Sequence, residues 1–379
     1  MTTADARIAR LFEPVRIGDL LLPNRLVMAP MGRLGSTGGI LGQPYADYYR
    51  RRAEGGTALI ISEATAIDDP LSAGYPQASN FHGRAPLAAW ARVVEEVHAG
   101  GGFFAPQLWH AGIARGSDAP DAARGARSPS GIIVEPDAGA VSAAGAFAKP
   151  MSESDIADVC AAFARSAANA EAIGCDAIEI HGAHGYLLDQ FLWAATNRRG
   201  DAYNGAIDKR GRFSAEVIAA IKAAGVRIPV IFRFSQWKMQ DYGARVFETV
   251  AELDVFLQAL VDAGADALHP STRRFWLPEF EGSDRSLAAW TKALSGLPVI
   301  AVGSIGVGSS FTGEEAETGG SSRLPANLEH LLEALERGDF DMVALGRTLL
   351  TNPAWANLIR DGRYDEIRPY AAADAATIA

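Results

Sequence analysis

Short apolar runs alternate with longer segments of helical periodicity along most of the chain. Runs of this length, bounded by Gly and Pro, are typical of strands buried in a parallel sheet. We predict eight strands, at residues 26–30, 59–62, 103–108, 177–180, 230–234, 267–270, 299–302 and 342–345. Between and after them we predict helices at residues 45–54, 85–99, 153–173, 209–224, 247–263, 286–294, 326–336 and 353–359.

The helix ends carry recognisable stop and start signals. Gly55, Gly174, Gly225 and Gly264 each follow a helical segment, where a left-handed residue closes the helix. Alternating strands and helices build a parallel sheet, and eight such units predict a closed (β/α)₈ TIM barrel. We expect one domain over residues 1–379, with the barrel core at about 24–360. A doubly wound open sheet is the rival fold, but the chain has no G-x-G-x-x-G turn after its first strand.

Three segments fall outside these units. Residues 11–23 contain Gly18-Asp19 between apolar runs, which predicts a β-hairpin that caps the bottom of the barrel. A long Gly-, Ala- and Pro-rich stretch follows the third strand (111–150), and a second irregular stretch follows the seventh strand (306–324). Loops of this length are typical of functional lids or of disorder.

Composition narrows the class of partner. The net charge of −10 argues against nucleic acid or an anionic membrane as the main partner, and we expect a small-molecule substrate. No apolar run approaches the ~20 residues that span a bilayer, and the N-terminal residues do not resemble a signal peptide, so we expect a cytoplasmic protein. Cys160 and Cys175 are too few for an iron–sulfur or Cys-rich zinc site, and we expect buried thiols. The sequence is compatible with a homo-oligomer.

The active site of a barrel lies at the carboxyl ends of its strands. Gln107 and Arg233 fall there; their alternative roles are a backbone-capping amide and a buried ion pair with Glu179 or Asp266. After the seventh and eighth strands come two glycines, each followed by a polar residue. Singly these glycines fit tight turns, but together they suggest a phosphate cradle of backbone N–H groups and a guanidinium, formed by Gly303, Ser304, Gly346 and Arg347.

The sharpest local cluster is His181-x-x-His184-x-Tyr186, directly after the fourth strand. Two imidazoles and a phenol can bind an oxyanion and supply a proton, bind a metal, or fill space. The metal alternative draws on His110 and His269, which end neighbouring strands, and would give a metal-dependent barrel hydrolase. It lacks an obvious acidic ligand and leaves the phosphate cradle unexplained.

Taken together, these residues resemble the old yellow enzyme family of FMN-dependent ene-reductases. The resemblance runs from Leu11 to about Asn352 and rests on an ordered series of motifs. These are Leu11-Phe-Glu-Pro, Leu22-Pro-Asn-Arg-Leu-Val-Met-Ala-Pro-Met31, Glu63-Ala64, Pro106-Gln-Leu-Trp-His-Ala-Gly112, His181-Gly-Ala-His-Gly-Tyr-Leu-Leu-Asp-Gln-Phe-Leu192, Asn197-Arg-Arg-Gly-Asp-Ala-Tyr-Asn-Gly205 and Gly346-Arg347.

The resemblance implies a bound FMN, with NADH or NADPH as the diffusible hydride donor in a ping-pong cycle. It implies that His181 and His184 bind the carbonyl oxygen of an α,β-unsaturated substrate, and that Tyr186 protonates the carbon opposite the hydride. A small N-methylated amine demethylated on the same fold is the alternative activity. The flavin contacts implied are those of Ala29, Pro30, Met31, Gly32, Ala64, Gln107, Arg233, Gly303, Ser304, Gly346 and Arg347.

Two departures from the family pattern bear on the site. Gly32 stands where many relatives have Thr or Cys, so no side chain is available there to hydrogen-bond the flavin near O4. Residues 271–280 after the sixth strand differ from the best-known members, and Trp276 in this segment is a candidate substrate-pocket wall, with a packed surface loop as the alternative.

Overall fold

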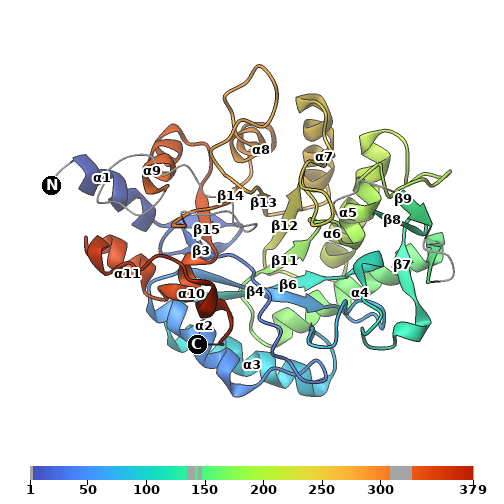
Figure 1. Ribbon diagram of the computed structural model, residues 1–379, viewed down its shortest axis with the longest axis horizontal. Helices are drawn as coiled ribbons and strands as arrows, with labels where there is room; N and C mark the ends of the chain where they lie inside the picture. The colour runs from blue at the N-terminus through green and yellow to red at the C-terminus, as the bar shows by residue number, and fades with distance from the viewer. Residues whose placement is uncertain (1–2, 135–140, 144–146, 308–326, 379) are drawn as a thin grey trace.

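Eight parallel strands close into a barrel in the computed structural model, which describes residues 3–134, 141–143, 147–307 and 327–378 (Figure 1). The barrel is closed because β3 pairs with both β15 and β4. The strands are β3 (Leu26–Met28), β4 (Leu59–Ala66), β6 (Phe103–Trp109), β11 (Ile178–His181), β12 (Val230–Ser235), β13 (Ala267–Ser271), β14 (Ile300–Val302) and β15 (Met342–Leu345). All eight predicted strands are therefore confirmed, with β4 longer than predicted and β3 shorter.

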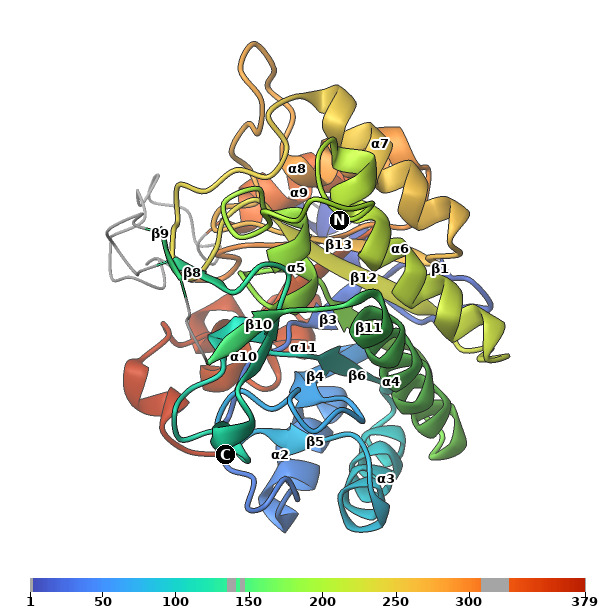
Figure 2. The same cartoon turned by 90° about the vertical axis from the view of Figure 1, so that its right-hand side faces the viewer.

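Helices pack around the outside of the barrel, as both views show (Figures 1 and 2). They are α2 (Gln43–Glu54), α3 (Arg84–Ala99), α4 (Glu153–Ala172), α6 (Ile207–Ala223), α7 (Val250–Asp262), α8 (Leu287–Ser295), α9 (Leu328–Arg337) and α11 (Trp355–Arg360). The start of α4 is fixed by a capping box, in which Ser152 accepts from Asp155 N–H and the Asp155 carboxylate accepts from Ser152 N–H. The Thr249 hydroxyl caps the start of α7 by accepting from Glu252 N–H, so this helix begins three residues later than predicted.

Shorter elements complete the chain around these units. They are α1 (Thr3–Ala9), α5 (Leu187–Leu192), α10 (Thr348–Thr351), β1 (Val15–Ile17), β2 (Leu20–Leu22), β5 (Ser79–Asn80), β7 (Ala126–Ser128), β8 (Ile132–Val134), β9 (Val141–Ala143), β10 (Ala148–Pro150), and the 3₁₀ turns Arg10–Phe12, Gly112–Ala114, Ala122–Arg124, Tyr364–Glu366 and Ala372–Ala375.

The lower half of the barrel interior is apolar. Alternate residues of a strand face the same side, so every second residue points inward. Near the strand starts these inward residues form one buried cluster, which includes Ala105, Ala177, Ile231 and Ala267. The β1–β2 hairpin contributes the fully buried Ile17 and Leu22 to the same cluster. The hairpin therefore caps the bottom of the barrel, as predicted.

The stretch after β6 is more ordered than its composition suggests. It forms two small pairs, β7 with β10 and β8 with β9. Arg127 of β7 ties this stretch to the barrel, because its guanidinium contacts Asp69 at 2.9 Å and Asp155 at 2.7 Å. Most of the second long stretch, 306–324, falls outside the described residues. Among the helices that the structure describes, none combines the length and apolarity needed to cross a bilayer.

Candidate active site

The upper half of the barrel interior is polar, in contrast to the lower half. On the four strands that carry Ala105, Ala177, Ile231 and Ala267, the next inward-facing position comes two residues later. These positions hold Gln107, Glu179, Arg233 and His269. These four side chains are at most 7% exposed. The period of two thus carries four polar groups to the carboxyl end of the barrel, where the site was predicted.

Glu179 joins two of these groups. Its Oε1 accepts a hydrogen bond from Gln107 Nε2 at 2.8 Å, and its Oε2 lies 2.5 Å from His269 Nδ1. Burial lowers the pKa of His269, although the Glu179 charge opposes that shift. The Gln107 amide is therefore oriented by a neighbouring carboxylate rather than by a backbone group, which corrects the backbone-capping alternative.

Arg233 is buried with an incomplete set of partners. One of its terminal nitrogens, Nη2, donates to Ser271 Oγ at 3.3 Å, while its Nε has no hydrogen-bond partner. Burial lowers the pKa of Arg233, and the Glu179 charge offsets part of that shift. Asp266 is not its partner, because it binds Lys222 at 2.6 Å. A buried, incompletely satisfied guanidinium is costly unless a further acceptor reaches it.

His181 and His184 converge at the end of β11. His184 Nδ1 lies 3.3 Å from His181 Nε2, and His184 Nε2 lies 2.8 Å from Ser271 Oγ. Both pKa values are held well below 6.5, first by burial and then by the positive charge of Arg233. The two imidazoles are therefore neutral near pH 7 and present N–H groups rather than imidazolium charges.

Tyr186 lies on the other side of His181. Its ring is 4.9 Å from the His181 ring and 5.2 Å from the Trp109 ring, edge-on in both cases. Its hydroxyl lies 3.5 Å from the sulfur of Met239, a half-exposed residue. Burial raises the pKa of Tyr186, so the phenol keeps its proton at neutral pH.

A buried ion pair supports the turn that carries His184 and Tyr186. Lys238 Nζ lies 2.8 Å from Asp189 Oδ1, and both side chains are 0% exposed. Asp189 Oδ2 accepts from Gly185 N–H at 2.7 Å, and Lys238 also donates to Ser235 O. This support allows His184 to hold a left-handed backbone, with φ of 64°.

The residues predicted to contact a flavin lie at the same end of the barrel. Ala29 N–H bonds to Leu345 O, directly before Gly346, and Ala64 pairs in register with Gln107. Gly303 has φ of 144°, and an added Cβ would lie 2.6 Å from Thr272 O, so only glycine fits. The side chain of Ser304 donates to Arg273 O, and Arg347 stacks over Tyr370.

These residues fit an anionic, ring-bearing cofactor. Arg233 Nε and His269 Nε2 are buried polar atoms without partners, and they come from inward positions of adjacent strands. The glycine at 303 keeps the backbone close-packed where a phosphate cradle was predicted. Arg233 thus supplies an unused donor for a flavin ring at this barrel end, and Gly303 stands where contact with the phosphate is predicted.

The structure bears on two sequence-based hypotheses, the histidine metal site and the placement of Trp276 in the pocket wall. His110 does not join a shared histidine cluster: its Nδ1 accepts from Gly112 N–H, and its Nε2 lies 3.5 Å from Asp69 Oδ1. No group of His, Cys, Asp or Glu that could hold a metal ion occurs among the described residues, so the hydrolase alternative has no geometric support. Trp276 stacks on His330 of α9 with ring centroids 5.3 Å apart, the packing that the alternative of a packed surface loop predicts.

Trp237 is the tryptophan that contacts the histidine pair. Its ring lies 4.4 Å from the His184 ring, and its Nε1 donates to Ser271 O. Sequence reasoning missed Trp237, Lys238 and the roles of Glu179 and Ser271. The period-two alternation would have marked Glu179 and Ser271 as inward-facing, but no sequence signal marks the two loop residues.

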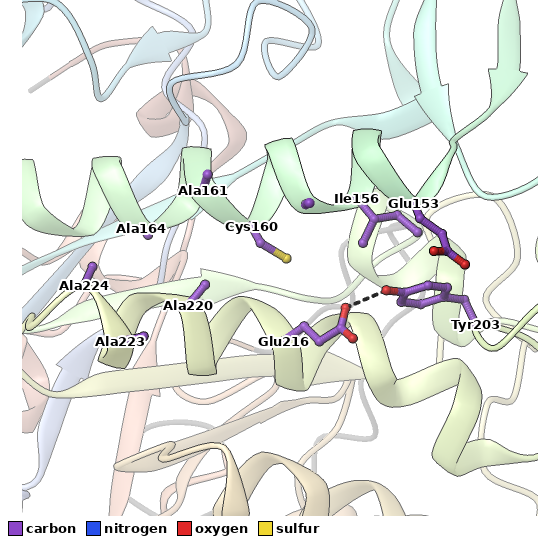
Figure 3. A pocket seen from close by; sticks show the side chains of 11 residues that line it. Glu153, Ile156, Cys160, Ala161, Ala164, Tyr203, Glu216, Ala220, Ala223 and Ala224 are labelled. Carbon is purple, nitrogen blue, oxygen red and sulfur yellow. Dashed lines mark hydrogen bonds between the residues drawn. The ribbon is translucent and has the colours of Figure 1, made fainter.

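A surface groove lies between α4 and α6, on the outer side of the barrel wall (Figure 3). Alanines line much of it, Tyr203 donates to Glu216 across it, and Cys160 points into it. Burial raises the pKa of Cys160 to about 12, so its thiol stays protonated. A protonated thiol is a poor nucleophile, and the candidate active site is the polar barrel end.

A TIM barrel with a buried arginine and an oriented glutamine at the carboxyl ends of its strands is the architecture that the sequence resemblance implies. Residues 10–320 match the NADH:flavin oxidoreductase / NADH oxidase family, whose cofactor is FMN. The chain belongs to this family, which confirms FMN as its cofactor and NAD(P)H-dependent oxidoreduction as its class of activity.

Individual proteins agree with this assignment. The chain is 32% identical to the NADH oxidase of Thermoanaerobacter brockii over 374 residues, which cover 94% of this chain but only 52% of that protein. The structure superimposes on morphinone reductase in complex with tetrahydroNAD with a TM-score of 0.78, at 28% identity, covering 96% and 93% of the two chains. Old Yellow Enzyme from Pichia sp. AKU4542 gives a TM-score of 0.78 at 26% identity, covering 97% and 90%. The resemblance stated from the sequence is thus confirmed.

Proposed function

We propose that this protein reduces the activated C=C bond of α,β-unsaturated carbonyl compounds. The observation that carries this proposal is the convergence of two neutral imidazoles, His181 and His184, beside the protonated phenol of Tyr186. Two neutral imidazoles whose Nε2 and Nδ1 atoms face each other can both donate to one carbonyl oxygen, which gains negative charge as its β-carbon accepts a hydride. The likeness to morphinone reductase, a reductase by name, supports a reductive activity.

FMN, reduced by NADH or NADPH, would supply that hydride. Gln107 is suited to the pyrimidine edge of the flavin, because one amide hydrogen is committed to Glu179 while its oxygen and second hydrogen remain for a ligand. Arg233 would balance negative charge on the reduced ring. Ala29, Pro30, Met31, Gly32 and Ala64 would line the ring, and Gly303, Ser304, Gly346 and Arg347 would hold the phosphate.

Tyr186 would deliver the proton to the α-carbon. Its raised pKa keeps the proton on the oxygen until a carbanion-like carbon develops nearby, and the Trp109 and His181 rings fix its orientation. A positioned general acid contributes roughly 10²- to 10⁴-fold in rate.

Replacement of Tyr186 by Phe tests this assignment. In stopped-flow measurements, Tyr186→Phe should slow re-oxidation of the reduced enzyme by 2-cyclohexenone roughly 10²-fold or more, while reduction by NAD(P)H stays close to wild type. Tyr75→Phe is the matched control, because Tyr75 packs against the same Trp109 ring at 5.5 Å and should retain the wild-type rate. Equal enone rates in Tyr186→Phe and wild type would remove the proton-donor role.

A further inference from the structure

The hydrogen bonds around the histidine pair determine which ring nitrogens carry hydrogen. Ala183 N–H donates to His181 Nδ1 at 3.3 Å, so that nitrogen is an acceptor. A neutral imidazole has one donor and one acceptor nitrogen, so the His181 hydrogen lies on Nε2, which faces His184 Nδ1 at 3.3 Å. Every ring contact is then satisfied if His184 Nδ1 accepts from His181 and His184 Nε2–H donates to Ser271 Oγ.

This arrangement conflicts with binding a substrate oxygen between the two rings. A carbonyl or phenolate oxygen at that point needs a donor from each ring, which means hydrogen on His181 Nε2 and on His184 Nδ1. His184 would then have a bare Nε2 on a buried side chain, 2.8 Å from Ser271 Oγ. A buried acceptor without a donor is costly, so that nitrogen needs a hydrogen from Ser271.

Ser271 can serve in either role. A hydroxyl has one hydrogen to donate and two lone pairs to accept with. Arg233 Nη2 occupies one lone pair at 3.3 Å, and a guanidinium is always a donor. The remaining lone pair can accept from His184 Nε2–H, or the O–H can rotate and donate to a bare Nε2. Ser271 is 2% exposed, so water does not replace it readily.

We propose that His184 changes tautomer when a carbonyl or phenolate oxygen binds between the two imidazoles, and that the Ser271 hydroxyl permits the change. One proton leaves His184 Nε2 for water and one reaches Nδ1 from water, so the charge of the ring is unchanged. Ser271 is a positioning residue, because it acts through His184 and not on the substrate. The proposal rests on the oxyanion role of the histidines under the proposed function.

The test is NMR of the FMN-loaded enzyme labelled with ¹⁵N-histidine, with and without saturating phenol. Protonated and bare ring nitrogens have distinct ¹⁵N shifts, and a His184→Asn variant assigns the signals among the seven histidines. We expect hydrogen on Nε2 of His184 without phenol and on Nδ1 with phenol. The same tautomer in both samples, or no binding of phenol, would overturn the proposal.

Variants distinguish the effect of the Ser271 hydroxyl from the effects of neighbouring groups. Ser271→Ala should bind phenol roughly ten-fold more weakly, the effect of one lost hydrogen bond, and should not show the wild-type tautomer change. Ser271→Thr, which keeps the hydroxyl, should restore both. Ser235→Ala is the control, since the Ser235 hydroxyl accepts from the His184 backbone N–H and does not bond to the ring. A loss of the tautomer change in Ser235→Ala as large as in Ser271→Ala would overturn the proposal.

Enone reduction is measured separately on the same samples. A phenol-dependent tautomer change in an enzyme that does not reduce 2-cyclohexenone would refute the proposed function and leave the role of Ser271 standing. Enone reduction with a constant His184 tautomer would support the proposed function and refute the tautomer change.

Discussion

Removing Lys238 should destabilise the protein far more than removing a lysine from a surface ion pair. Lys238 and Asp189 are both 0% exposed and 2.8 Å apart, so Lys238→Met leaves a buried carboxylate without its counter-charge. Breaking a buried pair from one side costs about 3–5 kcal/mol. At ~2.1 cal/mol/K per residue, the unfolding entropy of 379 residues is about 0.8 kcal/mol/K, so Tm should fall by about 4–6 °C.

Differential scanning calorimetry of matched variants tests that reasoning. Lys222→Met is the control, because Lys222 and Asp266 are 29% and 25% exposed and such pairs contribute about 0–1 kcal/mol. Lys238→Met combined with Asp189→Asn should recover most of the loss, because Asn keeps an acceptor for Gly185 N–H without a buried charge. A Lys238→Met shift no larger than that of Lys222→Met would refute the argument, as would a double variant less stable than the single one.

Three further outcomes follow from the site. An added Cβ at Gly32 meets nothing closer than 3.8 Å, so Gly32→Thr should fit. One new hydrogen bond to the reduced flavin should raise the two-electron potential of the flavin by about 10–30 mV. An unchanged potential in a dye-coupled redox titration would contradict this prediction. Arg233→Met should weaken FMN binding roughly ten-fold or more in a fluorescence-quenching titration, whereas wild-type affinity would argue against contact with the flavin. Because the folded-state pKa values of His181 and His184 lie below 6.5, the unfolded chain takes up protons first as the pH falls. Stability should therefore be full above about pH 6.5 and fall below it, and a His181→Asn/His184→Asn variant should show a shallower slope in urea unfolding between pH 5 and 7.5, roughly the span of an ordinary histidine titration.

The pattern of apolar and polar residues along the chain by itself determined the architecture. Each barrel strand is a buried apolar run and each outer helix an amphipathic segment, so eight alternations leave few folds other than a closed barrel. The same pattern placed Gln107, Arg233 and the histidine motif at strand ends, because strand polarity fixes which end carries the site. Helix boundaries were set locally, and Ser152 shows why: its capping partners lie within three residues.

Only the tertiary structure decided which polar groups meet. Glu179 binds both Gln107, its register partner on the adjacent strand β6, and His269 on β13, which lies beyond β12, although these residues are far apart in the chain. His110 and His269 look equivalent as strand-end histidines, yet each pairs with a different buried carboxylate, at Asp69 and Glu179. The contact of Trp237 with His184 depends on the path of a loop. Periodicity fixes the direction in which a side chain points, but its partners depend on the register between strands and on loop conformation, which are set by packing across the whole barrel.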